Sequence, residues 1–168
     1  GCTNAADWNA NRSSQIHSFD TSSIQAQPDI IAKLPQGALE DGVLDVAAST
    51  DYAPAEFLDP SGTAVGYDVD LTNAIAAVLG VKGKVHTAEF DSIIASIGSK
   101  YDAGISSFTV TPERTAEVDM TAYINVGSRF NVQAGNPKGV ETSDHLKLCG
   151  RTIGVQVGTA QETTMRDA

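Results

Sequence analysis

The side chains best suited to binding an anion lie in one short stretch, residues 101–114, which reads YDAGISSFTVTPER. An apolar strand at residues 103–105 is followed by hydroxyl side chains, namely Ser106, Ser107, Thr109 and Thr111. Thr111-Pro112 is typical of a helix N-cap followed by proline at the first helical position. Arg114 adds a two-pronged donor one turn into that helix. Free N–H groups and the positive end of a helix dipole favour an anion there.

A second helix start of the same kind occurs in GTAQE, residues 158–162, where a Gly-Thr turn precedes a predicted helix. The histidines, by contrast, indicate no chemistry. They are His17, His86 and His145, and their spacing fits no metal site. No nucleophile has a base beside it in the sequence. We therefore expect binding, with no metal and no cofactor.

Alternating strands and helices must position these residues. Strands are predicted at 43–48, 81–87 and 103–105, and helices at 71–79 and from Asp91 to 97, with Asp91 as the cap. Two βαβ units in this order predict a parallel sheet covered by helices on both faces. A weak helix is expected in DIIAKLP, and further strands at 129–134 and 151–157.

The carboxyl ends of the first three strands carry the sequences STDYAP, TAEFD and SSFTVTPER. Parallel strands present their carboxyl ends at one edge of a sheet, which is where ligands of such sheets bind. We expect these three segments to converge on one crevice.

Composition excludes some classes of function. The chain has 168 residues, 41% of them hydrophobic, a formal net charge of −10 and a pI near 4.5. It is long enough for one ordinary domain or parts of two. Its acidity argues against nucleic-acid binding, which needs a basic face. No apolar run approaches the length of a membrane-spanning helix.

Each of the two cysteines raises a question of its own. Cys2, in the opening GC, is what remains when a bacterial lipoprotein signal is cut before the lipid-carrying cysteine; the alternative is a cloning scar. In the lipoprotein interpretation, residues 3–28 form a flexible tether. Cys149 is either a buried free thiol or, in an exported protein, half of a disulfide.

Three blocks of the sequence resemble the amino-acid-binding proteins of ABC importers, such as the glutamine-, histidine- and lysine/arginine/ornithine-binding proteins. The blocks are LDVAASTDYAPAEFLDPSGTAVGYDVDLTNAIAAVLG, FDSIIASIGSKYDAGISSFTVTPER and LKLCGRTIGVQVGTAQE. The resemblance runs from about Asp29 to the last residue. It implies a periplasmic-binding-protein-like α/β fold with two lobes and parallel-rich sheets, which close on an amino acid between them.

The resemblance assigns roles residue by residue. Arg114 corresponds to the arginine that binds the ligand α-carboxylate, and Thr109 to a residue that contacts its α-amino and α-carboxylate groups. Ser107 corresponds to a position that offers its carbonyl to the ammonium. The remaining matched positions are Asp51, Tyr52, Phe90, Thr159 and Ala160, with Ser106 and Gln161 as weaker candidates. TDYAP is shorter than the usual spacing, and Ala55 replaces an aromatic residue, so side-chain specificity stays open.

The resemblance also implies a domain plan. Residues 1–28 would be the lipid-anchor cysteine and tether, 29–126 the first lobe with a hinge about 124–129, and 127–168 the start of an incomplete second lobe. The expected partners are a small-molecule amino acid, an ABC transporter permease and the membrane, the last through the lipid anchor alone. The expected location is extracytoplasmic, either as a cell-surface lipoprotein or in the periplasm.

Two further expectations follow from the resemblance. The first is an alternative function, because dehydratases that act on prephenate-like acids share this scaffold. The second is that these residues are a fragment of a longer receptor. The fragment alone would bind amino acids weakly or not at all, and it would be poorly stable or recruit a second copy. Cys149 would pair with a cysteine beyond Ala168.

Overall fold

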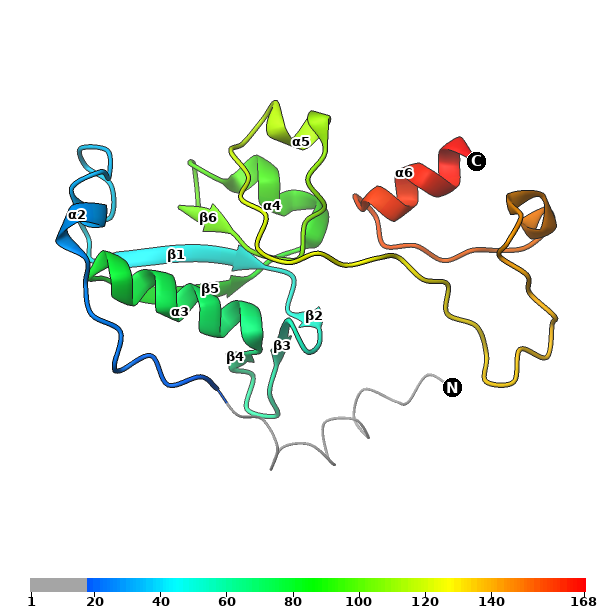
Figure 1. Ribbon diagram of the computed structural model, residues 1–168, viewed down its shortest axis with the longest axis horizontal. Coiled ribbons are helices and arrows are strands. Elements are labelled where there is room, and N and C mark those ends of the chain that lie inside the picture. The colour runs from blue at the N-terminus through cyan, green and yellow to red at the C-terminus, as the bar shows by residue number, and fades with distance from the viewer. Residues whose placement is uncertain (1–17) are drawn as a thin grey trace.

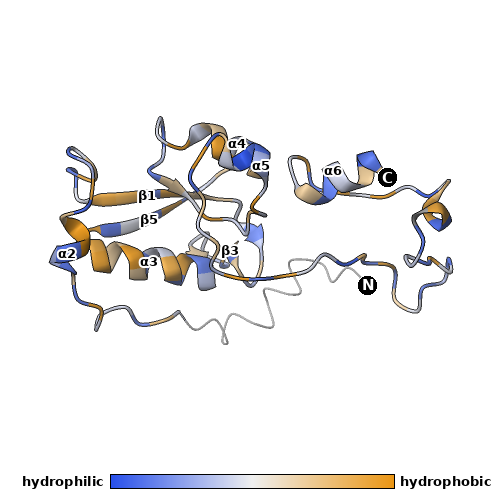
Figure 2. Ribbon diagram, turned by 45° about the horizontal axis from the view of Figure 1, so that its top comes forward, coloured by the Kyte–Doolittle hydropathy of each residue, from blue (hydrophilic) through white to orange (hydrophobic). Residues whose placement is uncertain are grey.

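The computed structural model describes residues 18–168, so Cys2 and residues 3–17 of the predicted tether lie outside the described part. The described residues form a packed α/β unit followed by a long extended arm, which carries a 3-10 helix and the last α-helix (Figure 1). Figure 2 shows β1 and much of α3 in the colour of hydrophobic residues.

The central sheet has three parallel strands in the order β5-β1-β6, as the βαβ pattern predicts. They are β1 (Val43–Ala48), β5 (Lys82–Thr87) and β6 (Ala103–Gly104). Val46 of β1 is in register with Val85 of β5 and with Ala103 of β6. Because β1 is the central strand, residues from Leu44 to Ala48 are largely buried and form the floor of the core.

Helices cover both faces of this sheet, which confirms the predicted layers. Ala76 of α3 (Tyr67–Leu79) packs with Leu44 and Val46 on one face. Ile93 of α4 (Phe90–Ser96) packs with Ala47 on the other. Gly80 ends α3 in the left-handed conformation, at φ 72°, as its position predicts. The prediction that Asp91 caps α4 is wrong: the helix begins at Phe90 with Glu89 as the N-cap.

A small antiparallel sheet lies beside the start of α3. It consists of β2 (Asp51–Tyr52), β3 (Glu56–Leu58) and β4 (Ala64–Val65), in that order. Gly66 links it to α3 at φ 124°, and a Cβ atom there would lie 2.2 Å from the Ala55 carbonyl oxygen. Only glycine therefore allows the helix to start this close to the hairpin.

The segment before β1 lies against α3. The Phe19 N–H donates to Asp70 (2.9 Å), and the Gln27 N–H donates to the Val78 carbonyl (2.8 Å). The weak helix predicted in DIIAKLP is present as α2 (Pro28–Ile31). The domain boundaries at 28 and 126 remain predictions.

The short helix α5 (Pro112–Thr115) lies on the packed unit, and the arm beyond it contains η1 (His145–Leu148) and α6 (Ala160–Asp167). The predicted strands at 129–134 and 151–157 do not form. Their apolar residues, including Phe130, Val132, Ile153 and Val155, are exposed, and no strand of the described residues pairs with them. An extended segment becomes a strand only when a neighbouring edge accepts its hydrogen bonds.

Cys149 is an exposed free thiol within the described part of the chain, and its predicted disulfide remains a prediction. Among the described residues, no helix is both long enough and apolar enough to cross a membrane.

Candidate functional site

The carboxyl ends of the three parallel strands meet, as the sequence predicts. After β1, the Ser49 N–H donates to the Ser106 hydroxyl beyond β6 (3.0 Å). The hydroxyl groups of Thr50 and Thr87 lie 2.8 Å apart and join β1 to β5. The strand ends are therefore tied together by side chains, and the predicted site residues start from this edge.

Arg114 occupies the start of α5, where the local sequence signals place it. Thr111 is the N-cap, and its Oγ1 accepts the Arg114 N–H at 3.3 Å, while Pro112 is the first helical residue. The guanidinium is half-buried, and this partial desolvation lowers the pKa of Arg114 below its usual value. An arginine side chain remains protonated in proteins, so the site keeps one positive charge.

Two aromatic rings support the guanidinium. Phe90 and Phe108 stack with their centroids 4.6 Å apart, and the Arg114 Cζ atom lies 5.7 Å and 5.3 Å from the two ring centroids. The contact orients the planar group and withdraws one face of it from water. Phe90 was a predicted site residue, whereas Phe108 was missed although it lies within the 101–114 motif.

Arg114 also joins the packed unit to the arm. Its Nη1 donates to the Thr109 carbonyl (2.7 Å) and its Nη2 to the Gly158 carbonyl (2.8 Å). Gly158 lies against Asp91 at the start of α4, because a Cβ atom on Gly158 would lie 2.7 Å from the Asp91 Cβ. The structure thus brings three predicted site residues, Phe90, Thr109 and Arg114, next to the Gly-Thr turn.

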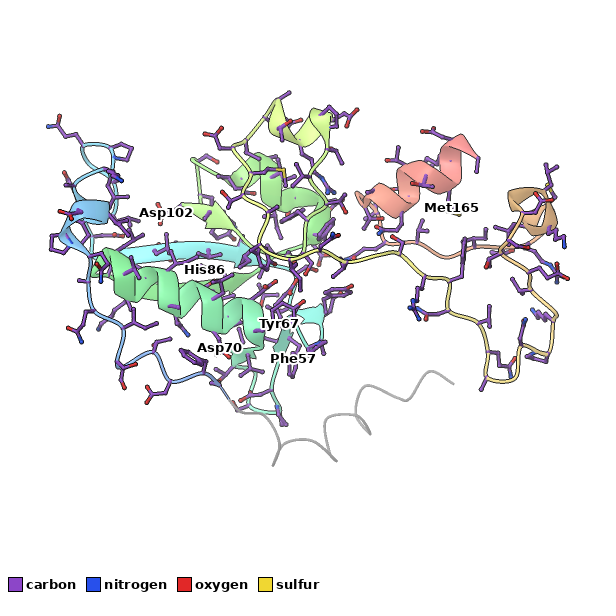
Figure 3. The ribbon with its side chains drawn as sticks, in the orientation of Figure 1. Phe57, Tyr67, Asp70, His86, Asp102 and Met165 are labelled. Atoms are coloured by element: carbon purple, nitrogen blue, oxygen red, sulfur yellow. The ribbon has the colours of Figure 1, made fainter. Side chains whose placement is uncertain are left out.

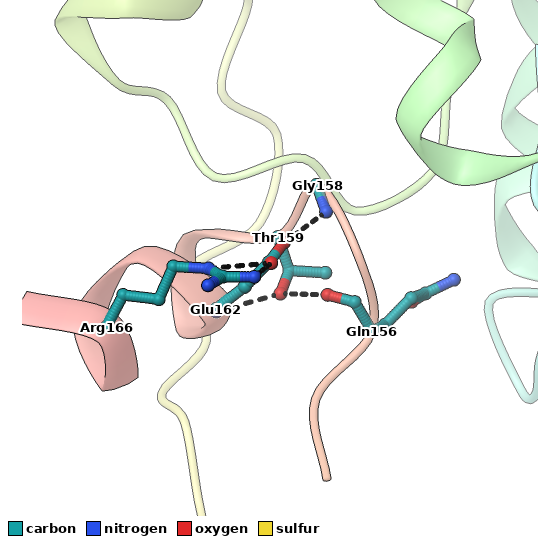
Figure 4. Close-up of polar contacts among 5 residues, drawn as sticks. All are labelled: Gln156, Gly158, Thr159, Glu162 and Arg166. Carbon is teal, nitrogen blue, oxygen red and sulfur yellow. Dashed lines mark hydrogen bonds and ion pairs between the residues drawn. The ribbon is translucent and has the colours of Figure 1, made fainter.

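The Gly-Thr turn is built as its sequence predicts (Figure 4). Thr159 is the N-cap of α6, and its Oγ1 accepts the Glu162 N–H (3.1 Å) and donates to the Gln156 carbonyl (2.8 Å). Glu162 accepts the Gly158 N–H and two N–H groups of Arg166, and these hydrogen bonds lower the pKa of its carboxyl group.

The other predicted site residues lie in α6 and after β1. Ala160 is the first residue of α6, and the Gln161 amide donates to the Ser128 hydroxyl (2.6 Å). Asp51 is exposed and accepts a hydrogen bond from the Ser49 hydroxyl (2.9 Å), and Tyr52 is 56% exposed. Whether these residues contact a ligand remains a prediction.

The two neighbouring serines differ in their surroundings. Ser106 is 4% exposed, and its hydroxyl donates to the Glu56 carboxyl at 2.5 Å, below the candidate site. Ser107 has a left-handed backbone, at φ 51°, and lies close to the phenol groups of Tyr67 and Tyr123. Figure 3 shows Tyr67 at the start of α3, beside the β2-β3 hairpin.

Beneath the site lie two carboxyl groups that sequence reasoning missed. Glu56 and Asp68 are completely buried. Burial, first of all, raises the pKa of Glu56 to about 8, and burial likewise raises the pKa of Asp68. No sequence signal identified them, because acidic residues in a hairpin and in the first turn of a helix normally face water.

Solved structures with similar folds are amino-acid-binding proteins. The ancestral amino acid-binding protein AncCDT-1, described as a precursor of cyclohexadienyl dehydratase, superposes with a TM-score of 0.69 at 32% identity, covering 77% of this chain and 58% of that one. The arginine-bound form of truncated ArgBP from T. maritima gives a TM-score of 0.63 at 33% identity, covering 76% and 60%. These matches confirm the periplasmic-binding-protein-like fold.

Two curated relatives are similar over most of this chain. Arginine-binding protein ArgT of Corynebacterium glutamicum is 33% identical over 138 residues, which are 81% of this chain and 44% of that protein. The lysine/arginine/ornithine-binding periplasmic protein of Escherichia coli is 34% identical over 119 residues, or 70% and 45%. The chain therefore spans less than half the length of either relative.

The resemblance found in the sequence is confirmed by a family match that covers most of the packed unit and the arm. Residues 44–166 match the family described as bacterial extracellular solute-binding proteins, family 3. This range contains β1 from Leu44 onward, α3, the strand ends, Arg114 and the Gly-Thr turn of α6. The chain belongs to this family of bacterial extracellular solute-binding proteins.

Proposed function

We propose that the chain is the ligand-capturing part of a solute-binding receptor, and that its ligand is an amino acid. The observation that carries this proposal is the placement of Arg114. Its guanidinium is stacked on Phe90 and Phe108 and joins the strand-end edge to the Gly-Thr turn. A fixed guanidinium beside a helix N-terminus suits the bidentate binding of a carboxylate.

The guanidinium can serve this role without moving far. In the structure it donates to two backbone carbonyl groups, those of Thr109 and Gly158. Because a guanidinium has further N–H donors, it can hold this position and still bind a carboxylate. Thr109 is exposed next to it and supplies a hydroxyl and an N–H group for the same ligand.

A basic amino acid is the ligand class that we propose first, and arginine within it. Several relatives are named as arginine-binding proteins, and one as a lysine/arginine/ornithine-binding protein. L-cystine is the second candidate, because another relative is an L-cystine-binding protein. The exposed carboxylate of Asp51 beyond β1 and the net charge of −10 favour a cationic side chain.

We further propose that the receptor works outside the cytoplasm, that it delivers its ligand to an ABC permease, and that lipid on Cys2 anchors it to the membrane. Family membership supports an extracellular location. The anchor is supported by the GC sequence alone.

An enzyme of the dehydratase type is the second candidate, favoured by the likeness to AncCDT-1. A dehydratase needs a general acid that reaches the substrate. Glu56 carries a raised pKa but is 0% exposed, and so is Asp68. Binding without chemistry is therefore the function that we propose.

Calorimetry on the protein expressed from its complete reading frame tests the proposal. L-arginine, L-lysine, L-glutamine and L-cystine are titrated in parallel, and prephenate is incubated with the protein and assayed for product. We expect saturable heat with at least one basic amino acid and no turnover of prephenate. Absence of heat with every amino acid, or formation of product from prephenate, would contradict the proposal.

A further inference from the structure

Glu56 and Asp68 are the largest charged side chains that the packed unit buries completely. Each leaves one carboxyl oxygen, Glu56 Oε2 and Asp68 Oδ1, without a donor among the described N–H and O–H groups. After burial, the Asp68 carboxyl also acts to raise the pKa of Glu56, so the two carboxyl groups are close enough to interact. Two adjacent buried carboxylates would repel each other in a medium of low dielectric constant, so the pair needs a proton.

The backbone holds the two residues together. The Tyr67 and Asp68 N–H groups donate to the carbonyls of Pro54 (3.2 Å) and Ala55 (2.9 Å), which places the first turn of α3 directly on the start of β3. Gly66 permits this approach, since any Cβ atom there would overlap the Ala55 carbonyl. The carboxyl pair is therefore a built feature of the hairpin–helix junction.

The surrounding hydrogen bonds indicate which carboxyl group carries the proton. Asp68 lies in the first turn of α3, where the helix dipole favours a negative charge, and its Oδ2 accepts the Tyr123 O–H at 2.9 Å. Glu56 has no such helix terminus, and its Oε1 accepts the Ser106 O–H. A proton on Glu56 Oε2, donated to Asp68 Oδ1, satisfies both remaining oxygens.

We propose that Glu56 and Asp68 share one proton, so that one carboxyl group is neutral and the other is ionised. This carboxyl pair holds in position the strand-end edge at which the ligand is proposed to bind. The chain of hydrogen bonds runs from the Ser49 N–H to Ser106, then to Glu56 and Asp68, and ends at the Tyr123 hydroxyl. It connects the ends of β1 and β6 to α3 and to the start of the arm. Glu56 and Asp68 are thus positioning residues, which do not touch the ligand.

The pair acts on the site through short connections. Ser106 precedes Ser107, whose left-handed backbone turns the chain toward Phe108 and Thr109. Tyr123 precedes the exposed segment that leads to Gly158. Loss of the shared proton would place two negative charges at this junction, where Asp51, Tyr67 and Tyr123 are the titratable groups that interact with the pair. No positive charge is among these groups.

The shared proton can be detected without any ligand. Infrared difference spectroscopy of the protein near neutral pH should show the carbonyl band of a protonated carboxylic acid. Glu56→Gln should remove this band while preserving the fold, because the amide can donate to Asp68 and accept from Ser106. Asp68→Asn should also remove it, because the asparagine amide can donate to an ionised Glu56.

Glu40→Gln, at an exposed carboxyl group, is the matched control and should leave the band unchanged. Absence of the band from the unmodified protein, or its persistence in both Glu56→Gln and Asp68→Asn, would overturn the proposal. Persistence in Asp68→Asn alone would show that the proton belongs to Glu56 without being shared, which would also overturn it.

A second measurement tests the positioning role and rests on the proposed function. The affinity for the amino acid found by calorimetry should weaken as the pH rises through the range in which the pair loses its proton. In Glu56→Gln this pH dependence should be lost. An unchanged pH profile in Glu56→Gln would contradict the positioning role, whereas failure of every amino acid to bind would contradict only the proposed function.

Discussion

The Arg114 guanidinium donates to the Gly158 carbonyl at 2.8 Å, across a sequence separation of 44 residues. This contact connects the two helix N-termini that the sequence indicates as suited to binding an anion, one at α5 and one at α6. It uses a backbone oxygen of the second turn, so it depends on the position of that turn and not on a side chain. The guanidinium therefore helps to hold the arm against the strand-end edge, together with the contact of Gly158 with Asp91.

Replacement of Arg114 by alanine should abolish amino-acid binding while leaving the packed unit folded. Removal of one partner from a desolvated charged pair costs roughly 2–5 kcal/mol, or about one and a half to three and a half decades in affinity. Calorimetry and circular dichroism measure the two effects. Arg114→Lys should lose much of the same affinity because it lacks the planar fork. Arg151→Ala, on the exposed arm, is the control, and unchanged affinity in Arg114→Ala would show that the carboxylate assignment is wrong.

Gly158→Ala should detach the Gly-Thr turn from α4. The new Cβ atom would lie 2.7 Å from the Asp91 Cβ and 3.0 Å from its Cα, at a backbone φ of 76° that disfavours alanine. We expect weaker amino-acid binding and faster proteolysis of the arm, with an unchanged unfolding midpoint for the packed unit.

Gly150→Ala is the matched control for that variant, because Gly150 has φ 75° and nothing within 4 Å of its added Cβ. Both substitutions introduce the same backbone strain, so any difference between them reports the contact with Asp91. Equal affinities of the two variants would exclude a role for this contact in binding.

The carboxyl pair should make the stability of the packed unit depend on pH. The fold raises the pKa of Glu56 from 4.5 to about 8 and also raises the pKa of Asp68. Between these values the folded state holds a proton that the unfolded state has released, so the free energy of unfolding falls as the pH rises from about 4.5 toward about 8. Below about pH 4.5 both the folded and the unfolded state hold the proton, and the pair makes its full contribution to the free energy of unfolding.

Guanidinium denaturation at a series of pH values measures this slope. Glu56→Gln removes the proton and should flatten the profile, whereas Glu40→Gln should retain the slope of the unmodified protein. A profile in Glu56→Gln as steep as that of the unmodified protein would rule out Glu56 as its source.

Gly66→Ala should destabilise the packed unit more than any other glycine substitution in the small sheet. Its Cβ atom would lie 2.2 Å from the Ala55 carbonyl oxygen, whereas Gly62→Ala at φ 84° meets nothing within 4 Å. Backbone strain alone costs roughly 1–2 kcal/mol for Gly62→Ala. Gly66→Ala adds a clash that separates Asp68 from Glu56. Chemical denaturation of both variants checks the order, and equal losses would show that the close approach is not required.

The sequence by itself determined the features that depend on neighbouring residues. Gly80 ends α3, Thr111-Pro112 begins α5, and Thr159 caps α6. These features can be predicted because the hydrogen bonds of a helix cap join residues within about one turn of each other. The three parallel strands and their covering helices followed from the apolar pattern. Since parallel strands share one edge, the sequence also placed Phe90, Thr109 and Arg114 in one region.

Tertiary structure alone decided the features that depend on distant partners. Residues 129–134 and 151–157 have the composition of strands, yet no strand among the described residues pairs with them, and pairing is a property of a neighbour. Ser106 has a hydroxyl group like those of Ser107 and Thr109, but Ser106 is buried and its hydroxyl donates to the Glu56 carboxyl group. Glu56 and Asp68 are ordinary acidic residues until the fold removes water from both and places them together, because burial then favours a shared proton over two charges.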